Sequence, residues 1–218
     1  SGLNNNGIAT TAAGGINFNA DIGKKVEFSS SYFYNYLNND IQRDIFRETV
    51  SGEQVFTTNQ NQIRDDQNHN HRVNLYLKAK LDSLSELIYR GSGRFNDANG
   101  TDSTQLLNQT NFISQSTSDQ NYFSIGQLLN TTNTLQYRRK LGAPGRTISV
   151  QGNFSLQNDD DELDLLALNT IIFDTFNILN TLDQVQFEDV NSLTYGGRRA
   201  YTEPLGIGHF LQANYRHT

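Results

Sequence analysis

Apolar and polar side chains alternate along several stretches of this sequence. Between residues 26 and 36 the even positions are mostly apolar and the odd positions mostly polar. Successive side chains of a β-strand point to opposite faces of a sheet, so the pattern predicts a strand with one apolar and one polar face. Residues 8–21 show the same alternation. The short turn Asp21–Lys25 joins the two arms into a predicted hairpin over 8–36.

The same unit recurs twice further along the chain. Residues 72–95 predict a hairpin that turns at Asp82–Ser85, and residues 135–157 predict one that turns at Gly142–Gly145. Polar segments separate these hairpins, and we expect long loops there, over 37–70, 97–120 and 158–206.

Some of these loop segments contain signs of order. The first loop contains a possible strand pair, 41–50 with 54–59, and the third contains an apolar stretch, 163–173, that suits a strand or a short helix. The last strand, His209–His217, is expected to stay unpaired, which makes about seven strands.

Strand length and loop asymmetry together suggest a fold class. The predicted arms exceed the usual ~5–6 residues of a soluble strand and suit the ~9–11 residues of a tilted strand that crosses a bilayer. Short turns at one end and long loops at the other are typical of outer-membrane barrels. We therefore expect an all-β, antiparallel transmembrane barrel with short periplasmic turns and long extracellular loops. Seven strands with open edges cannot close in lipid, so residues 1–218 are expected to be part of one larger barrel domain.

The alternation also assigns side chains to the two faces of this expected wall. The residues expected to face lipid are Ile16, Phe18, Val26, Phe28, Tyr32, Tyr34, Val73, Leu75, Leu77, Leu87, Tyr89, Ile148, Val150 and Phe154. The residues expected to face the lumen are Asn17, Asn19, Glu27, Ser29, Arg72, Asn74, Lys78, Lys80, Arg90, Gln151 and Asn153.

Composition narrows the functional classes. Only 35% of the residues are hydrophobic, yet 11% are aromatic and there are two prolines, which disfavours disorder. Cysteine is absent, which excludes a disulfide framework and a thiolate metal site. The net charge of -6 gives no support to nucleic-acid binding. The sequence contains no run of about 18 apolar residues, so it predicts no transmembrane helix. No signal peptide is recognisable either. A barrel protein needs one for export, so we expect a fragment or an internal segment.

Two acidic or histidine clusters are candidate metal ligands. His69 and His71 lie two apart, near Asp65 and Asp66, and could share a metal, although a site needs three or four ligands. Asp159, Asp160 and Asp161, followed by Glu162, could hold Ca²⁺, but no glycine follows where an EF-hand loop needs one. A polar strand end and a solvated acidic loop are the favoured interpretations. No cofactor is predicted.

Cations and aromatic residues on the predicted hairpins have two interpretations each. The basic residues of the polar parity are Arg72, Lys78, Lys80, Arg90, Arg94, Arg138 and Lys140. They could attract an anionic substrate or an acidic plug; the favoured alternative is pairing with Asp21, Asp82 and Glu86. Tyr32, Phe33, Tyr34 and Tyr36 could stack on sugars, but the even-numbered tyrosines suit an aromatic girdle.

No Gly-x-Ser-x-Gly elbow or phosphate-binding glycine loop is present, so no enzymatic role is expected.

Several short motifs resemble the outer-membrane β-barrel family related to TonB-dependent receptors. They are Gly15-Ile16-Asn17-Phe18-Asn19 before a Gly-Lys-Lys turn, Leu77-Lys78-Ala79-Lys80-Leu81-Asp82-Ser83, Tyr137-Arg138-Arg139-Lys140 followed by Gly145-Arg146-Thr147-Ile148-Ser149, and Tyr201-Thr202-Glu203-Pro204-Leu205. The resemblance implies a bacterial outer-membrane barrel of about 22 strands with an N-terminal plug. It also implies import of a large nutrient, or a structural role in a surface complex.

The resemblance implies partners as well: outer-membrane lipid, the remaining strands and plug of the same barrel, and a surface lipoprotein or other subunit of an outer-membrane complex. No plug, TonB-contacting segment or barrel C-terminus is recognisable in this sequence, so transport is expected of the parent protein. A structural barrel without transport and a soluble adhesin-like module are the alternatives, and the loop asymmetry argues against the latter.

Overall fold

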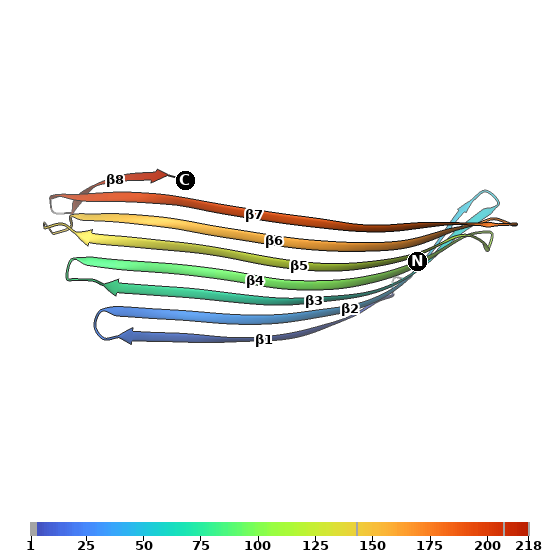
Figure 1. Cartoon of the computed structure of the whole chain (residues 1–218), viewed down its shortest axis with the longest axis horizontal. Helices are drawn as coiled ribbons and strands as arrows, with labels where there is room; N and C mark the ends of the chain where they lie inside the picture. The colour runs from blue at the N-terminus through green and yellow to red at the C-terminus, as the bar shows by residue number, and fades with distance from the viewer. Residues whose placement is uncertain (1–3, 143, 207, 218) are drawn as a thin grey trace.

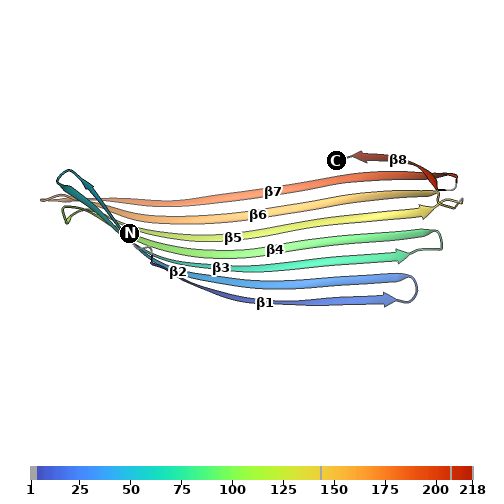
Figure 2. The same ribbon diagram turned by 180° about the vertical axis from the view of Figure 1, so that it is seen from behind.

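The protein folds as one antiparallel sheet in which each strand lies beside its neighbours in the sequence (Figure 1). The computed structural model describes residues 4–142, 144–206 and 208–217. Figure 2 shows the same single layer from behind. The strands are β1 (Asn4–Ile22), β2 (Val26–Ser51), β3 (Gln54–Lys80), β4 (Ser85–Thr110), β5 (Ile113–Lys140), β6 (Thr147–Ile172), β7 (Asn177–Gly206) and β8 (His209–His217).

The three predicted hairpins are confirmed, with their turns close to the predicted positions. In the first hairpin the pairing closes at Ile22↔Val26. In the second it closes at Lys80↔Glu86, and in the third at Lys140↔Thr147. Residue 143, inside the predicted third turn, lies outside the described residues. We call the end of the sheet that carries these turns the near end; it lies on the left in Figure 1.

The prediction of three long loops is wrong. The segments over 37–70, 97–120 and 158–206 extend the strands instead, and the pairing continues to Val50↔Val55, Thr110↔Ile113 and Ile172↔Asn177. The last strand is not unpaired, because β8 pairs with β7 from Gly206↔His209 to Gly197↔His217. The described residues therefore form eight strands where the sequence predicted seven.

Tight turns close the far end of the sheet. Gly52 has a φ of 63° in the turn between β2 and β3, a left-handed conformation that glycine adopts without steric cost. Asn111 and Phe112, between β4 and β5, have φ values of 50° and 64°. Asn tolerates this region, whereas for Phe it is a strained conformation. Long paired strands with short connections thus replace the expected loops.

The sheet has no hydrophobic core. Its accessible surface is 14918 Å², whereas a compact monomer of this mass would expose about 10,100 Å². Among the described residues, Ile88 and Ala167 are the buried hydrophobic ones. The sheet is also open. Its strand order begins at β1 and ends at β8, and the described residues of these two strands do not pair with each other. The closed wall expected of a barrel is therefore not formed by this chain alone.

The strands are unusually long. β7 has 30 residues and β3 has 27, which at about 3.3 Å per residue corresponds to roughly 90–100 Å. We divide the sheet into a near half (residues 4–36, 71–96, 127–157 and 196–217) and a far half (37–70, 97–126 and 158–195).

The described part of the chain contains no helix that is long and apolar enough to span a lipid bilayer.

Candidate functional site

The cross-strand register separates the two predicted residue sets. Val26 pairs with Ala79, and the row continues through Leu87, Tyr137 and Val150. Paired residues point to the same face, so every predicted lipid-facing residue lies on one side of the sheet, the apolar face. Every predicted lumen-facing residue lies on the opposite side, the polar face. The assignment of these faces to lipid and lumen stays a prediction.

The apolar face of the near half forms an apolar belt, which Arg139 on β5 and Arg199 on β7 interrupt. On β2 the belt extends from Val26 to Tyr36, and equivalent rows cross the neighbouring strands. Its side chains are exposed or half-buried: Ile16 is 67% exposed and Phe154 is 45% exposed, whereas Val26 and Phe28 are half-buried. The belt is therefore an uncovered apolar surface, and such a surface marks an interaction with a partner or a membrane.

Asn133 lies on this apolar face and weakens the alternation in the sequence. In the structure, the Tyr89 hydroxyl on the neighbouring strand donates a 2.7 Å hydrogen bond to Asn133 Oδ1. A polar group in an apolar environment is costly without such a partner. The hydrogen bond from Tyr89 thus satisfies Asn133 on the apolar face, and the sequence alone did not reveal this partner.

The two candidate histidines lie at the far border of the belt. The Tyr32 hydroxyl lies 2.8 Å from His71 Nδ1, and the Tyr34 hydroxyl lies 2.8 Å from His69 Nδ1. The Tyr36 and His69 rings are 4.9 Å apart. The described residues contain no group of three or more His, Cys, Asp or Glu side chains that could hold a metal ion. The ring contacts of His69 and His71 with Tyr32, Tyr34 and Tyr36 place the two histidines in an aromatic cluster.

The acidic run Asp159–Asp161 is part of β6, so the prediction of an acidic loop is wrong. Its carboxylates alternate between the faces, and Asp160 lies opposite Asp189 while Asp161 lies opposite Glu188. Like charges placed directly opposite each other destabilise a sheet. The alternation prevents the three carboxylates from converging on one cation.

Ion pairs neutralise some of the basic residues of the polar face. Lys78 Nζ lies 3.5 Å from Glu27 Oε1, and Arg138 Nη1 lies 3.0 Å from Glu86 Oε1. Pairing was the favoured prediction, and it is confirmed for Arg138 with Glu86. Lys78 is also paired, but with Glu27, which the sequence did not single out as a partner.

Three arginines on the polar face of β3 and β4 behave differently. Arg72, Arg90 and Arg94 are exposed, and the ion pairs found among the described residues do not include them. Arg72 lies directly opposite Arg94. The Arg90 guanidinium carbon lies 5.4 Å from the centre of the Tyr76 ring, within cation–π range.

A shallow hollow of about 560 Å³ lies beside Arg90. Arg90 and Tyr76 line it together with Asn74 and Ser92. Amide and hydroxyl groups from other strands complete its polar lining, and they include Asn17, Asn19, Ser29, Ser31, Thr132 and Thr134. The volume falls within the range of small-molecule sites. The residue types of this surface are recognisable in the sequence, but only the register brings them together.

Two polar contacts stabilise the near end. Asp82 Oδ1 accepts hydrogen bonds of 2.7 Å from the backbone N–H groups of Leu84 and Ser85, and these donors lower the pKa of Asp82. Arg146 donates two hydrogen bonds to Glu203, of 2.8 Å and 2.5 Å, which lower the pKa of Glu203 and connect the start of β6 to β7.

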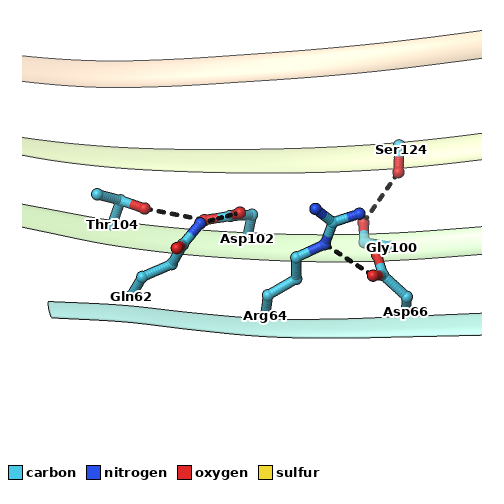
Figure 3. A network of polar contacts seen from close by, with 7 residues as sticks. All are labelled: Gln62, Arg64, Asp66, Gly100, Asp102, Thr104 and Ser124. Carbon is cyan, nitrogen blue, oxygen red and sulfur yellow. Dashed lines mark hydrogen bonds and ion pairs between the residues drawn. The ribbon is translucent and has the colours of Figure 1, made fainter. Parts of the chain in front are cut away.

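The far half is held by polar ladders (Figure 3). Gln62 Nε2 donates to Asp102 Oδ2 at 2.6 Å, and the Thr104 hydroxyl donates to Asp102 Oδ1 at 2.9 Å. Arg64 Nε lies 2.7 Å from Asp66 Oδ2. The Gln62–Asp102 hydrogen bond joins β3 to β4, whereas the Thr104–Asp102 and Arg64–Asp66 contacts lie within β4 and β3. A polar cross-strand pair stabilises a sheet without apolar side chains. This explains how segments predicted as loops can remain in register.

Charge is divided between the two halves. The near half and its flanking terminal residues carry 14 Lys or Arg against 5 Asp or Glu, whereas the far half carries 3 against 18. The corresponding net charges are +9 and −15, which together give the −6 of the chain. The cations thus gather in the near half, and Arg90 among them lines the hollow of the polar face.

Comparisons with known proteins do not place the chain in a family. No family model matches it, and no curated protein matches it. Among solved structures, it is similar to the membrane pore complex of pneumolysin (7% identity, 86% of this chain and 31% of that chain, TM-score 0.15). It is also similar to the siderophore receptor PiuA from Acinetobacter baumannii (9% identity, 94% of this chain and 50% of that chain, TM-score 0.14). The chain thus spans half or less of the length of these proteins.

Proposed function

We propose that the chain is part of the wall of a bacterial outer-membrane β-barrel related to TonB-dependent receptors, and that its parent protein imports or binds a large nutrient. The observation that carries this proposal is the apolar belt on one face of a sheet without a core. On β2 the belt covers about 11 residues, which at a 45° tilt amounts to roughly 25 Å of height, close to the apolar band of known barrels.

The opposite face supports the same proposal. It presents Asn, Ser and Thr side chains together with arginines, the kind of lining that a water-filled lumen requires. A soluble sandwich would instead cover the belt with a second sheet about 10 Å away. The outer edges of β1 and β8 would pair with further strands, because lipid does not tolerate unpaired edges.

Cysteine labelling tests the proposal cleanly, because the chain contains no cysteine. Glu53→Cys places a thiol in the turn between β2 and β3, at the far end, which would face the cell exterior. Lys24→Cys places one in the turn between β1 and β2, at the near end, which would face the periplasm. In cells that express the full-length protein, a membrane-impermeant maleimide should label Glu53→Cys directly. It should label Lys24→Cys only after the outer membrane is permeabilised.

The control is the parent protein without an introduced cysteine, with any native cysteine outside residues 1–218 replaced by serine in all variants. Detergent extraction provides a second measurement. The protein should stay with the membrane pellet after a carbonate wash and dissolve only with detergent. Recovery in the aqueous phase, or equal labelling of both cysteines in intact cells, would overturn the proposal. Import itself is tested by comparing nutrient uptake of the deletion strain with that of the complemented strain.

A further inference from the structure

We propose that Arg72, Arg90 and Arg94 form an oxyanion-binding site on the polar face, and that it takes a hydroxyl-rich oligomer carrying repeated carboxylate, sulfate or phosphate groups. The inference rests on the proposed function, because it assigns a ligand chemistry to the predicted lumen. The observation behind it concerns ion pairing. Lys78 and Arg138 on the same face form ion pairs, whereas the ion pairs found among the described residues do not include the three arginines.

The direct opposition of Arg72 and Arg94 is the first step of the argument. Like charges in directly opposed positions destabilise a sheet. An arginine cannot relieve this repulsion by losing its proton, since its guanidinium stays charged in proteins. A bound oxyanion removes the repulsion, and the planar fork of each guanidinium matches the geometry of a carboxylate, sulfate or phosphate.

The spacing of the three arginines indicates more than one anionic group. Arg90 lies four positions before Arg94 on β4, which corresponds to about 13 Å along the strand. Its guanidinium is held over the Tyr76 ring. The row between the two levels contains Asn74 opposite Ser92, and the Asn74 amide donates a 3.1 Å hydrogen bond to the Ser31 hydroxyl. A ligand with anionic groups about 13 Å apart would engage both levels.

The surroundings favour a hydroxylated ligand over an acidic polypeptide segment. The hollow beside Arg90 is lined by amide and hydroxyl side chains from several strands, including Asn17, Asn19 and Thr134. These groups both donate and accept hydrogen bonds, which suits a chain of hydroxyl groups. Thr134 already donates to Asn153, whereas no hydrogen bond of the Asn17 and Asn19 side chains is found among the described residues. An acidic segment of another protein domain would use the arginines but offer few hydroxyl groups to such amides.

Isothermal titration of the full-length protein in detergent micelles tests the site, with tetragalacturonate as the probe. Maltotetraose supplies the hydroxyl groups without charge, and tetraglutamate supplies the charge on a peptide. We expect saturable binding of tetragalacturonate, weaker binding of tetraglutamate and no binding of maltotetraose. Arg72→Gln and Arg94→Gln should each weaken binding of tetragalacturonate by about tenfold or more, the effect of losing one charge-assisted hydrogen bond.

Lys78→Gln is the matched control, because it removes one positive charge from the same face at a residue that already has an ion-pair partner. It should change the affinity by no more than about twofold, as expected for a partly exposed pair. An equal loss in Lys78→Gln, or no saturable binding of tetragalacturonate, would overturn the proposal. Tighter binding of tetraglutamate would overturn it in favour of an acidic protein segment.

The barrel proposal and the ligand proposal fail in different ways. If the cysteine-labelling pattern and the detergent requirement hold while tetragalacturonate does not bind, only the oxyanion site is wrong. If the protein appears in the aqueous phase, the barrel proposal is wrong whatever the titration gives.

Discussion

A charge placed in the apolar belt should destabilise the protein far more than the same charge placed on the polar face. Leu75 is a sharp position for this test, since it is 36% exposed on the apolar face, opposite Ser30 on β2 and Gly91 on β4. Ser29, adjacent to Ser30 in the chain, points to the polar face. The pair Leu75→Arg and Ser29→Arg therefore differs mainly in the face that receives the guanidinium.

The expected difference follows from the position of Leu75 near the middle of the belt. An arginine at the bilayer midplane of a barrel costs about 2–4 kcal/mol. This corresponds to a decrease of roughly 30- to 700-fold in the folding equilibrium constant. Ser29→Arg adds a side chain to a hydrated polar surface, where substitutions typically change the free energy of unfolding by about 0.5 kcal/mol.

Urea unfolding of the full-length protein in phospholipid vesicles measures both values. The folded fraction can be followed by the difference in gel mobility between unheated and heated samples. The two variants should differ by at least about 2 kcal/mol in the free energy of unfolding. Equal destabilisation, or a larger effect of Ser29→Arg, would show that the apolar face does not meet lipid.

Two further predictions concern local contacts. Tyr89→Phe should cost about 1–3 kcal/mol in the same urea titration, because it leaves Asn133 unsatisfied on the apolar face; adding Asn133→Leu should recover most of the loss, and failure of the double variant to do so would contradict the explanation. The pKa of Asp82 is lowered by backbone donors, so the stability that it adds to its turn is present above the ordinary carboxyl pKa and is lost as the pH falls through the lowered value. Amide exchange at Leu84, corrected for the intrinsic rate, should accelerate below about pH 4 in the native protein. In Asp82→Asn this pH step should be absent; its persistence would point to another group.

The hairpins of the near half could be predicted because only one of their faces is apolar. A period of two then appears directly in the sequence, as in the run from Val26 to Tyr36. The far half gives no such signal. Residues 59–62 are Asn and Gln on both faces, and residues 163–168 are mostly apolar on both faces. A strand whose two faces have the same character cannot be distinguished from a loop or a helix by periodicity.

The candidate site shows a second limit of sequence reasoning. Arg72 and Arg94 were both recognised as basic residues of one parity, yet their direct opposition depends on the register of β3 and β4, which the tight turn at Asp82 sets. Tyr89 and Asn133 meet in the same way, through the register of β4 and β5. Alternation predicts the face of a residue, whereas a cross-strand contact also requires the pairing offset.

The confinement of the apolar belt to one half of the sheet bears on the environment of the protein. The strands extend for roughly 90–100 Å, but the belt covers only about two-fifths of that length. Beyond Tyr36 the same face carries carboxylates such as Asp40, Asp65 and Asp160 among its side chains, and Asp65 raises the pKa of Asp40 by a hydrogen bond and by charge repulsion. A second protein sheet would need an apolar face along the whole strand. A bilayer is an apolar slab of fixed thickness between two aqueous phases, and the observed distribution matches such a slab, which favours the membrane over a soluble partner as the cover of the belt.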